Sequence, residues 1–198
     1  MKKLTAKFLR QHNACAEAAE WARKNKLIGK GMKSVTDACI KDNHYKWAVW
    51  LLPHEMNKKN RAQFAVFCAE SVLPIYEVKY PHNNAPRLAI QAAKEWLENP
   101  TKDNARSAKN AADAAAYSAA DEATADAKNA AYAAVYAADI ATYSTEAAKN
   151  AAYAAAYSAA YAAHSAPDEA TNDAYAANKT EINKNIIQFG LDILSEEK

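Results

Sequence analysis

Apolar residues recur along most of the chain at the three- and four-residue spacing of an amphipathic α-helix. Before residue 100 this pattern predicts five helices, over residues 4–25, 34–40, 44–53, 57–80 and 87–98. We expect Ser34 to cap the second helix, Pro53 to close the third, and Asn57 or Asn60 to open the fourth. Pro74 lies inside the fourth helix and should kink it, because proline removes one backbone hydrogen bond.

From Thr101 onward the pattern becomes repetitive. The letters KNAA recur at Lys109, Lys128 and Lys149, which predicts three successive helices of similar length folded back on one another. A final helix is expected from near Pro167, whose fixed φ suits a first helical turn.

Tyrosines stand among the alanines of this region at helical spacing: Tyr132 and Tyr136, then Tyr153, Tyr157 and Tyr161. Alanine lets helix axes approach closely, and we expect the phenol rings to fill the remaining space and to supply much of the cohesion. The tyrosine rows are therefore predicted to be core rather than a ligand site.

The chain has only 3 glycines and 6 prolines among 198 residues, and alanine fills about a quarter of its positions. This composition is typical of helices and provides too few turn formers for a many-stranded sheet. We predict an all-α fold, a compact bundle of about seven to eight helices in a single domain over residues 1–198. Its expected parts are a tryptophan-containing basic half (1–80), a hinge with a linking helix (81–100), and an Ala/Tyr-rich acidic half (101–198).

Charge divides the chain in the same place. Residues 1–100 carry 17 Lys+Arg and 9 Asp+Glu, whereas residues 101–198 carry 8 and 14. Such asymmetry favours attraction between the halves or a different partner for each of them, although solvated helix faces would explain it too.

Three cysteines, Cys15, Cys39 and Cys68, are each placed within a helical pattern. An odd count of this kind fits reduced, partly buried thiols and a cytoplasmic protein better than a disulfide framework. No stretch has the roughly 20 apolar residues of a membrane span, and the N-terminus lacks the apolar run of a secretory signal. We expect no membrane association.

Motifs for catalysis are lacking: the sequence has no phosphate-binding loop, nucleophile elbow or zinc-protease motif. His54 precedes Glu55, and His12 lies three residues before Cys15, but neither pair has further ligands at metal-site spacing. The basic residues are scattered lysines rather than one stripe. We therefore expect no enzyme activity, no cofactor, no metal site and no nucleic-acid binding.

The segment YPHNNAPR (80–87) is stiff and polar, because Pro81 and Pro86 restrict its backbone. Arg87 follows in the first turn of a helix, where the helix dipole mildly disfavours a cation. Two roles stay open for it. We favour a pair with a carboxylate of a neighbouring helix that locks a structural hinge; alternatively, Arg87 forms an anion- or partner-binding site with His82 and Asn84.

Several stretches carry a resemblance to a known family: LRQHNACAEAAEWA, YKWAVWLLP, FAVFCAESVLPIYE and YPHNNAPRLAIQAAKEWLE, followed by an alanine-rich helical tail. Together they resemble the Imm-5-like immunity proteins, small helical proteins of bacteria and phages, from about residue 4 to about residue 165. The element P-x-x-x-x-P-R-x-A-I is the most specific part. Ala85 stands where the family pattern implies a second arginine, and His82 where it implies an acid.

The resemblance implies a non-enzymatic protein that neutralises a toxin or a defence-system effector by binding it, in a bacterial cytoplasm and with a phage origin left open. The alternative is a small-molecule binder, such as a sponge for a nucleotide signal, with Arg87 near an anion site. A protein partner is favoured over a small anionic ligand, and an exposed Ala/Tyr face could also make the chain a homo-oligomer. The candidate binding residues are Trp47, Trp50, His54, Tyr80, His82, Asn84, Arg87 and Trp96.

Overall fold

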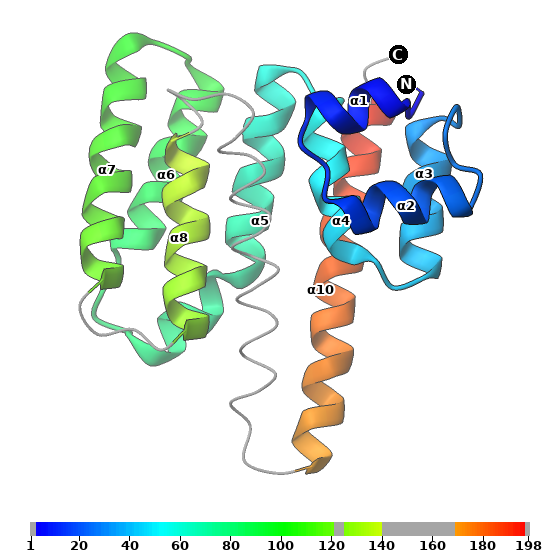
Figure 1. The fold of residues 1–198 in the computed structure, drawn as a ribbon. Coiled ribbons are helices and arrows are strands. Elements are labelled where there is room, and N and C mark those ends of the chain that lie inside the picture. Colours follow the sequence, from blue (N-terminus) through cyan, green and yellow to red (C-terminus); the bar gives the residue numbers. More distant parts are fainter. Residues whose placement is uncertain (1–2, 121–124, 140–168, 197–198) are drawn as a thin grey trace.

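The computed structural model describes residues 3–120, 125–139 and 169–196, and over these residues the fold is all-α, as predicted (Figure 1). An isolated β-bridge between Lys3 and Gly31 is the one pairing of extended backbone recorded there. Helices α5 to α8 pack on one another as a bundle, and α1 to α4 form a smaller lobe beside it. We call residues 3–54 the N-terminal lobe.

The N-terminal lobe begins with two short helices, α1 (Ala6–Gln11) and α2 (Ala16–Lys24). The prediction of one helix over residues 4–25 was wrong. Asn13 adopts a positive φ of 53°, which interrupts the helix, and Cys15 then caps α2 by accepting a hydrogen bond from the Ala18 N–H.

The lobe continues with α3 (Met32–Lys41) and α4 (Tyr45–Leu51). Gly31, not Ser34, is the N-cap of α3, so the predicted start was three residues late. Helix α4 passes into a 3-10 turn, η1 (Leu52–His54), which contains Pro53. Side chains of all four helices meet around a small cavity of about 30 Å³, lined by Leu4, Leu9, Ala18, Trp21, Ala22, Val35, Cys39, Trp47, Trp50 and Leu51.

Helix α5 (Lys58–Lys79) runs through the middle of the molecule and packs against α6, α8 and α10. Its N-cap is Asn57, one of the two residues predicted to open the helix, and the Asn57 side chain accepts a hydrogen bond from the Asn60 N–H. Pro74 lies within the helix, and the kink expected there stays a prediction. Phe64, Cys68 and Val72 have no measurable exposure. Because several helices cover it, α5 is apolar on more than one face.

Helix α6 (Ala85–Glu98) starts with Pro86 in its first turn and buries Ala89, Ile90, Ala93 and Trp96. Leu88, which lies between these positions, is 53 % exposed.

Helices α7 (Lys102–Ala120) and α8 (Ala125–Asp139) pack together through alanine. The fully buried positions include Ala108, Ala112, Ala115, Ala131, Ala133, Ala134, Ala137 and Ala138. Tyr132 and Tyr136 stack on each other at 6.3 Å between ring centres but are only half-buried, and Tyr117 is 77 % exposed. The expectation that tyrosine rings fill the space between the alanines is confirmed in part for Tyr132 and Tyr136, which pack partly buried against the core, while alanine methyl groups take its fully buried positions. Lys149, Tyr153, Tyr157, Tyr161 and Pro167 lie outside the described residues.

The last helix, α10 (Glu169–Glu196), returns to the first half of the chain and packs against α4, η1 and α5. Phe189 stacks on Phe67 with 4.0 Å between ring centres. One turn of α10 approaches so closely that a β-carbon on Gly190 would lie 2.8 Å from Leu52 Cδ1 and 2.9 Å from Phe64 Cε2. Glycine therefore sets the distance between α10 and the central helix. No described helix is long and apolar enough to cross a membrane.

Replacing Gly190 by alanine should lower the free energy of unfolding by about 1–2 kcal/mol, because the added methyl group overpacks the contact with Leu52 and Phe64. Asn185→Ala is the control, since Asn185 is exposed on the same helix. This control should leave stability unchanged or raise it slightly through helix propensity. Urea unfolding of both variants measures the difference, and a Gly190→Ala protein as stable as the control would contradict the packing.

The three thiols should differ sharply in reactivity. Cys15 is exposed, whereas Cys39 and Cys68 are buried. Burial, with a smaller effect of Asp42, raises the pKa of Cys39 to about 12, and burial also raises the pKa of Cys68. At pH 8 we expect one rapidly alkylated thiol per native chain, none in a Cys15→Ser variant, and three after unfolding of the original chain. Two rapidly alkylated thiols in the native protein would refute this.

The same two shifts have a consequence for stability at high pH. An unfolded thiol ionises near its ordinary pKa of 9.0, but the buried thiols keep their protons to higher pH. Stability should therefore fall as pH rises from about 9 toward 12, because the unfolded chain releases protons that the folded chain retains. Cys68→Ala should reduce this loss, as measured by urea unfolding across the pH range.

Candidate functional site

The candidate residues chosen from the sequence lie in three regions of the fold. Trp47, Trp50 and His54 belong to the N-terminal lobe, and Trp96 lies near the end of α6. The remaining ones, Tyr80, His82, Asn84 and Arg87, stand at or near the turn between α5 and α6. Trp47 and Trp50 line cavities of the N-terminal lobe, and Trp96 lines a separate cavity.

Arg87 forms a bidentate ion pair with Glu77 of α5. Its Nε and Nη2 each lie 2.6 Å from a carboxylate oxygen of Glu77. The hydrogen bonds to Glu77, followed by the attraction to its charge, raise the pKa of Arg87 above its ordinary value. Because the Arg87 side chain is 62 % exposed, we assign the pair a positioning role and only a small stabilisation. Lys94 of α6 and Glu70 of α5 make a second pair along the same edge.

The turn between α5 and α6 is ordered by its own polar groups. Asn83 Oδ1 accepts a hydrogen bond from the Ala85 N–H at 3.1 Å, and the Tyr80 ring lies 5.0 Å from that of Tyr76. His82 and Asn84 are exposed on its outer side. The pair of Arg87 with Glu77 is the contact with a neighbouring helix that the sequence favoured, whereas the hinge role of this segment stays a prediction.

Aromatic rings of the N-terminal lobe form two groups. In the first, the ring centres of His12 and His54 are 4.2 Å apart, and Phe8 and Trp50 pack edge-on against His54 at 5.5 Å and 4.8 Å. These contacts hold α1 against the end of α4.

The second group consists of Trp21, His44 and Trp47. His44 stacks on Trp47 with 3.8 Å between ring centres, and Trp21 lies 5.3 Å from Trp47. Trp21 Nε1 also donates to Asp42 at 3.1 Å. The two groups together fix Trp47 and Trp50 on neighbouring parts of α4, both half-buried.

A groove of about 410 Å³ runs beside Trp47 and Trp50. It lies between α4 and the break that separates α1 from α2, and it is lined by Asn13, Ala14, Cys15, Ala18, Lys46, Trp47 and Trp50. The exposed thiol of Cys15 therefore stands at the edge of the groove. We call it the tryptophan groove. The groove residues that were not identified from the sequence are those of the α1–α2 break, because the helical pattern continues across this break.

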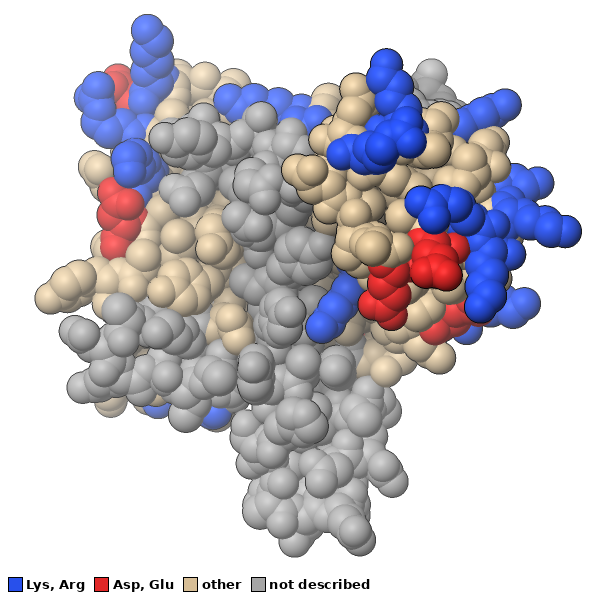
Figure 2. Space-filling view, viewed as in Figure 1, with Lys and Arg blue, Asp and Glu red and all other residues tan. Residues whose placement is uncertain are grey.

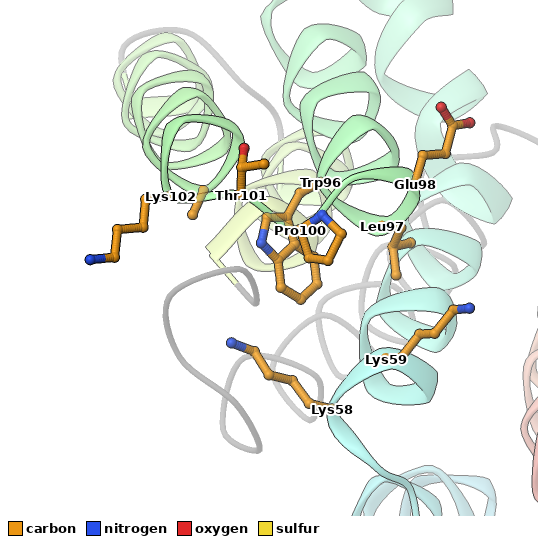
Figure 3. A pocket seen from close by; sticks show the side chains of 9 residues that line it. Lys58, Lys59, Trp96, Leu97, Glu98, Pro100, Thr101 and Lys102 are labelled. Atoms are coloured by element: carbon orange, nitrogen blue, oxygen red, sulfur yellow. The ribbon is translucent and has the colours of Figure 1, made fainter.

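A larger cavity, of about 600 Å³, opens where the start of α5 meets the end of α6 and the start of α7 (Figure 3). Its lining residues are Lys58, Lys59, Trp96, Leu97, Glu98, Pro100, Thr101, Lys102 and Ala105. We call it the lysine cavity. Only Trp96 had been selected from the sequence. The adjacent lysines Lys58 and Lys59 can be seen in the sequence, but their closeness to Lys102 results from packing between helices.

Charge is distributed unevenly over the surface. In Figure 2 lysine and arginine side chains surround much of the N-terminal lobe on the visible face, with acidic side chains gathered in one place. The lobe contains 10 Lys+Arg and 4 Asp+Glu. Within the lobe Lys33 forms an ion pair with Asp37, and its sequence carries an excess of six basic over acidic side chains.

The described residues contain no group of three His, Cys, Asp or Glu side chains placed to hold a metal ion. His12 and Cys15, the pair noted in the sequence, are separated by the break after α1, and His12 packs on Phe8 and His54.

Comparison with known proteins gives one match. The model of the family described as Imm-5 like putative immunity protein matches residues 51–184, which is more than half of the chain. The match includes the lysine cavity, the α5–α6 turn and the whole α5–α8 bundle, and it leaves residues 1–50 and 185–198 outside. No curated protein and no solved structure shows significant similarity to the chain. On the strength of the family match, the chain belongs to the Imm-5 like putative immunity protein family.

Proposed function

We propose that this protein is an immunity protein that inactivates a toxin or a defence-system effector by binding it as a one-to-one complex, without catalysing a reaction. Membership of the family supports the class of function. The tryptophan groove on a basic lobe supports inactivation by binding, because the groove offers a preformed, partly apolar surface for a protein partner. The proposal places this activity in the bacterial cytoplasm, where the three free thiols would stay reduced.

Tryptophan is among the side chains that contribute most to protein–protein affinity, because it buries a large rigid area and keeps one polar group. Trp47 and Trp50 are half-buried, so the lobe already fixes them while part of each ring stays accessible. Their order before binding would reduce the entropy lost on association.

The partner surface in this proposal is acidic. The excess of lysine and arginine on the N-terminal lobe would attract an acidic protein surface and accelerate its association, and salt would slow that association. Lys46 lies in the groove itself, next to Trp47. A partner segment carrying an apolar side chain and neighbouring carboxylates would match both features.

The function is tested by expressing the protein in bacteria together with candidate toxic effectors, starting with the products of genes adjacent to its own. We expect restored growth with one of them. With the purified pair, effector activity should fall linearly with added protein and reach zero at one equivalent. Full effector activity at saturating protein, across the whole set, would refute the proposal.

The position of the interface is tested by thiol footprinting. Cys15 is the exposed thiol of the three, so alkylation of the native protein reports on the groove. A bound effector should slow alkylation of Cys15 by about tenfold or more. Lys46→Glu should weaken binding by about tenfold, because it places a carboxylate opposite an acidic partner.

Lys184→Glu is the matched control, since Lys184 is exposed on α10 outside the groove and the substitution changes net charge equally. It should change affinity by less than about threefold at 0.15 M salt, where distant charges are screened. Equal effects of the two substitutions, or unchanged alkylation of Cys15 in an inhibitory complex, would place the interface elsewhere.

A further inference from the structure

We propose that the lysine cavity binds a phosphorylated small molecule with an aromatic ring, of the nucleoside diphosphate class. The cavity lies at the junction of α5, α6 and α7, and its volume of about 600 Å³ is within the range of cavities that hold such ligands. It shares no lining residue with the tryptophan groove, so the inference is independent of the proposed function.

Three lysines supply positive charge around this one cavity. Lys58 and Lys59 come from the first turn of α5, and Lys102 is the first residue of α7. Figure 3 shows Lys58 and Lys102 extending on the same side of Trp96, whereas Lys59 extends toward the other side. The ammonium groups of Lys58 and Lys102 are thus placed to contact neighbouring phosphate groups of one ligand.

The start of α7 adds hydrogen-bond donors at the same place. Thr101 caps the helix by accepting from the Asn104 N–H at 3.1 Å. The first amides of a helix have no acceptor within it, and the helix dipole there favours an anion. Asp103, the acid of this turn, is exposed and lies 3.7 Å from Arg106, and it does not line the cavity.

The remaining wall is largely apolar and suits a flat ring. Trp96, Leu97, Pro100 and Ala105 contribute to it. Lys58 Nζ lies 5.0 Å from the centre of the Trp96 ring, which orders both side chains beside the site. A ligand with phosphates at the lysines and a base against this wall would use both kinds of surface.

Glu98 is the carboxylate among the lining residues, and it opposes an anion. In Figure 3 its carboxylate points away from Lys58 and Lys102. Glu98→Gln should therefore raise the affinity for an anionic ligand. Partial unfolding of the variant could not produce such a gain in affinity.

Binding of ADP, pyrophosphate and adenosine to the purified chain, measured by calorimetry, tests the proposal without any effector. We expect saturable ADP binding with a dissociation constant below about 1 mM, at least about tenfold tighter than that of pyrophosphate or adenosine. Lys58→Gln and Lys102→Gln should each weaken ADP binding by about tenfold. Lys109→Gln removes the same charge from α7 outside the cavity and should change it by less than twofold.

The tryptophan signals locate the ligand directly. The chain has 4 tryptophans, so an ¹⁵N-labelled sample gives four indole N–H signals, and a Trp96→Phe variant identifies that of Trp96. ADP should shift this signal more than the other three. The proposal is overturned if ADP does not bind saturably, if pyrophosphate binds as tightly as ADP, or if the Trp96 signal does not change. It is also overturned if Lys102→Gln and Lys109→Gln have equal effects on ADP binding, or if Glu98→Gln binds ADP more weakly. None of these results would bear on inhibition of an effector.

Discussion

The burial of α5 on several sides is the constraint on which the rest of the structure depends. Helices α6, α8 and α10 all pack on it, and Phe64, Cys68 and Val72 have no exposed surface. A helix covered in this way needs apolar residues all round, and it fixes the position of every element that touches it. Its N-terminal turn brings Lys58 and Lys59 to the lysine cavity, and its outer edge presents Glu70 and Glu77 to α6.

The two sides of α5 are packed by different means. Toward α10 the contact is made by large side chains, including the stacked rings of Phe67 and Phe189, with Gly190 allowing close approach. Toward α8 the bundle relies on alanine, whose methyl group gives little buried area but loses no side-chain entropy on folding. The tyrosines described there lie at the border of the alanine contact and leave part of each ring to solvent.

The sequence predicted those features that depend on local chemistry. Asn57 was identified as a cap and Pro86 as part of the stiff entry to a helix, because side-chain acceptors and fixed φ angles act over a few residues. The break at Asn13 was missed, since a helical pattern continues across it and a positive φ leaves no mark in hydrophobicity. The buried side of α6 is also difficult to identify from the sequence, because alanines lie on several of its faces. The meeting of Lys58 with Lys102, 44 positions apart in the sequence, is a result of tertiary packing and could not be deduced from spacing.

The return of α10 to α4 and α5 also bears on how the protein is made. Leu52 and Phe64 are covered by a turn around Gly190, which the ribosome adds more than a hundred residues later. During synthesis these side chains stay uncovered while the alanine-rich helices emerge, a period of several seconds at about 5–20 residues per second. The nascent chain therefore exposes these apolar side chains during this interval. A chaperone would protect it, or a protease would degrade it, before the final helix has docked.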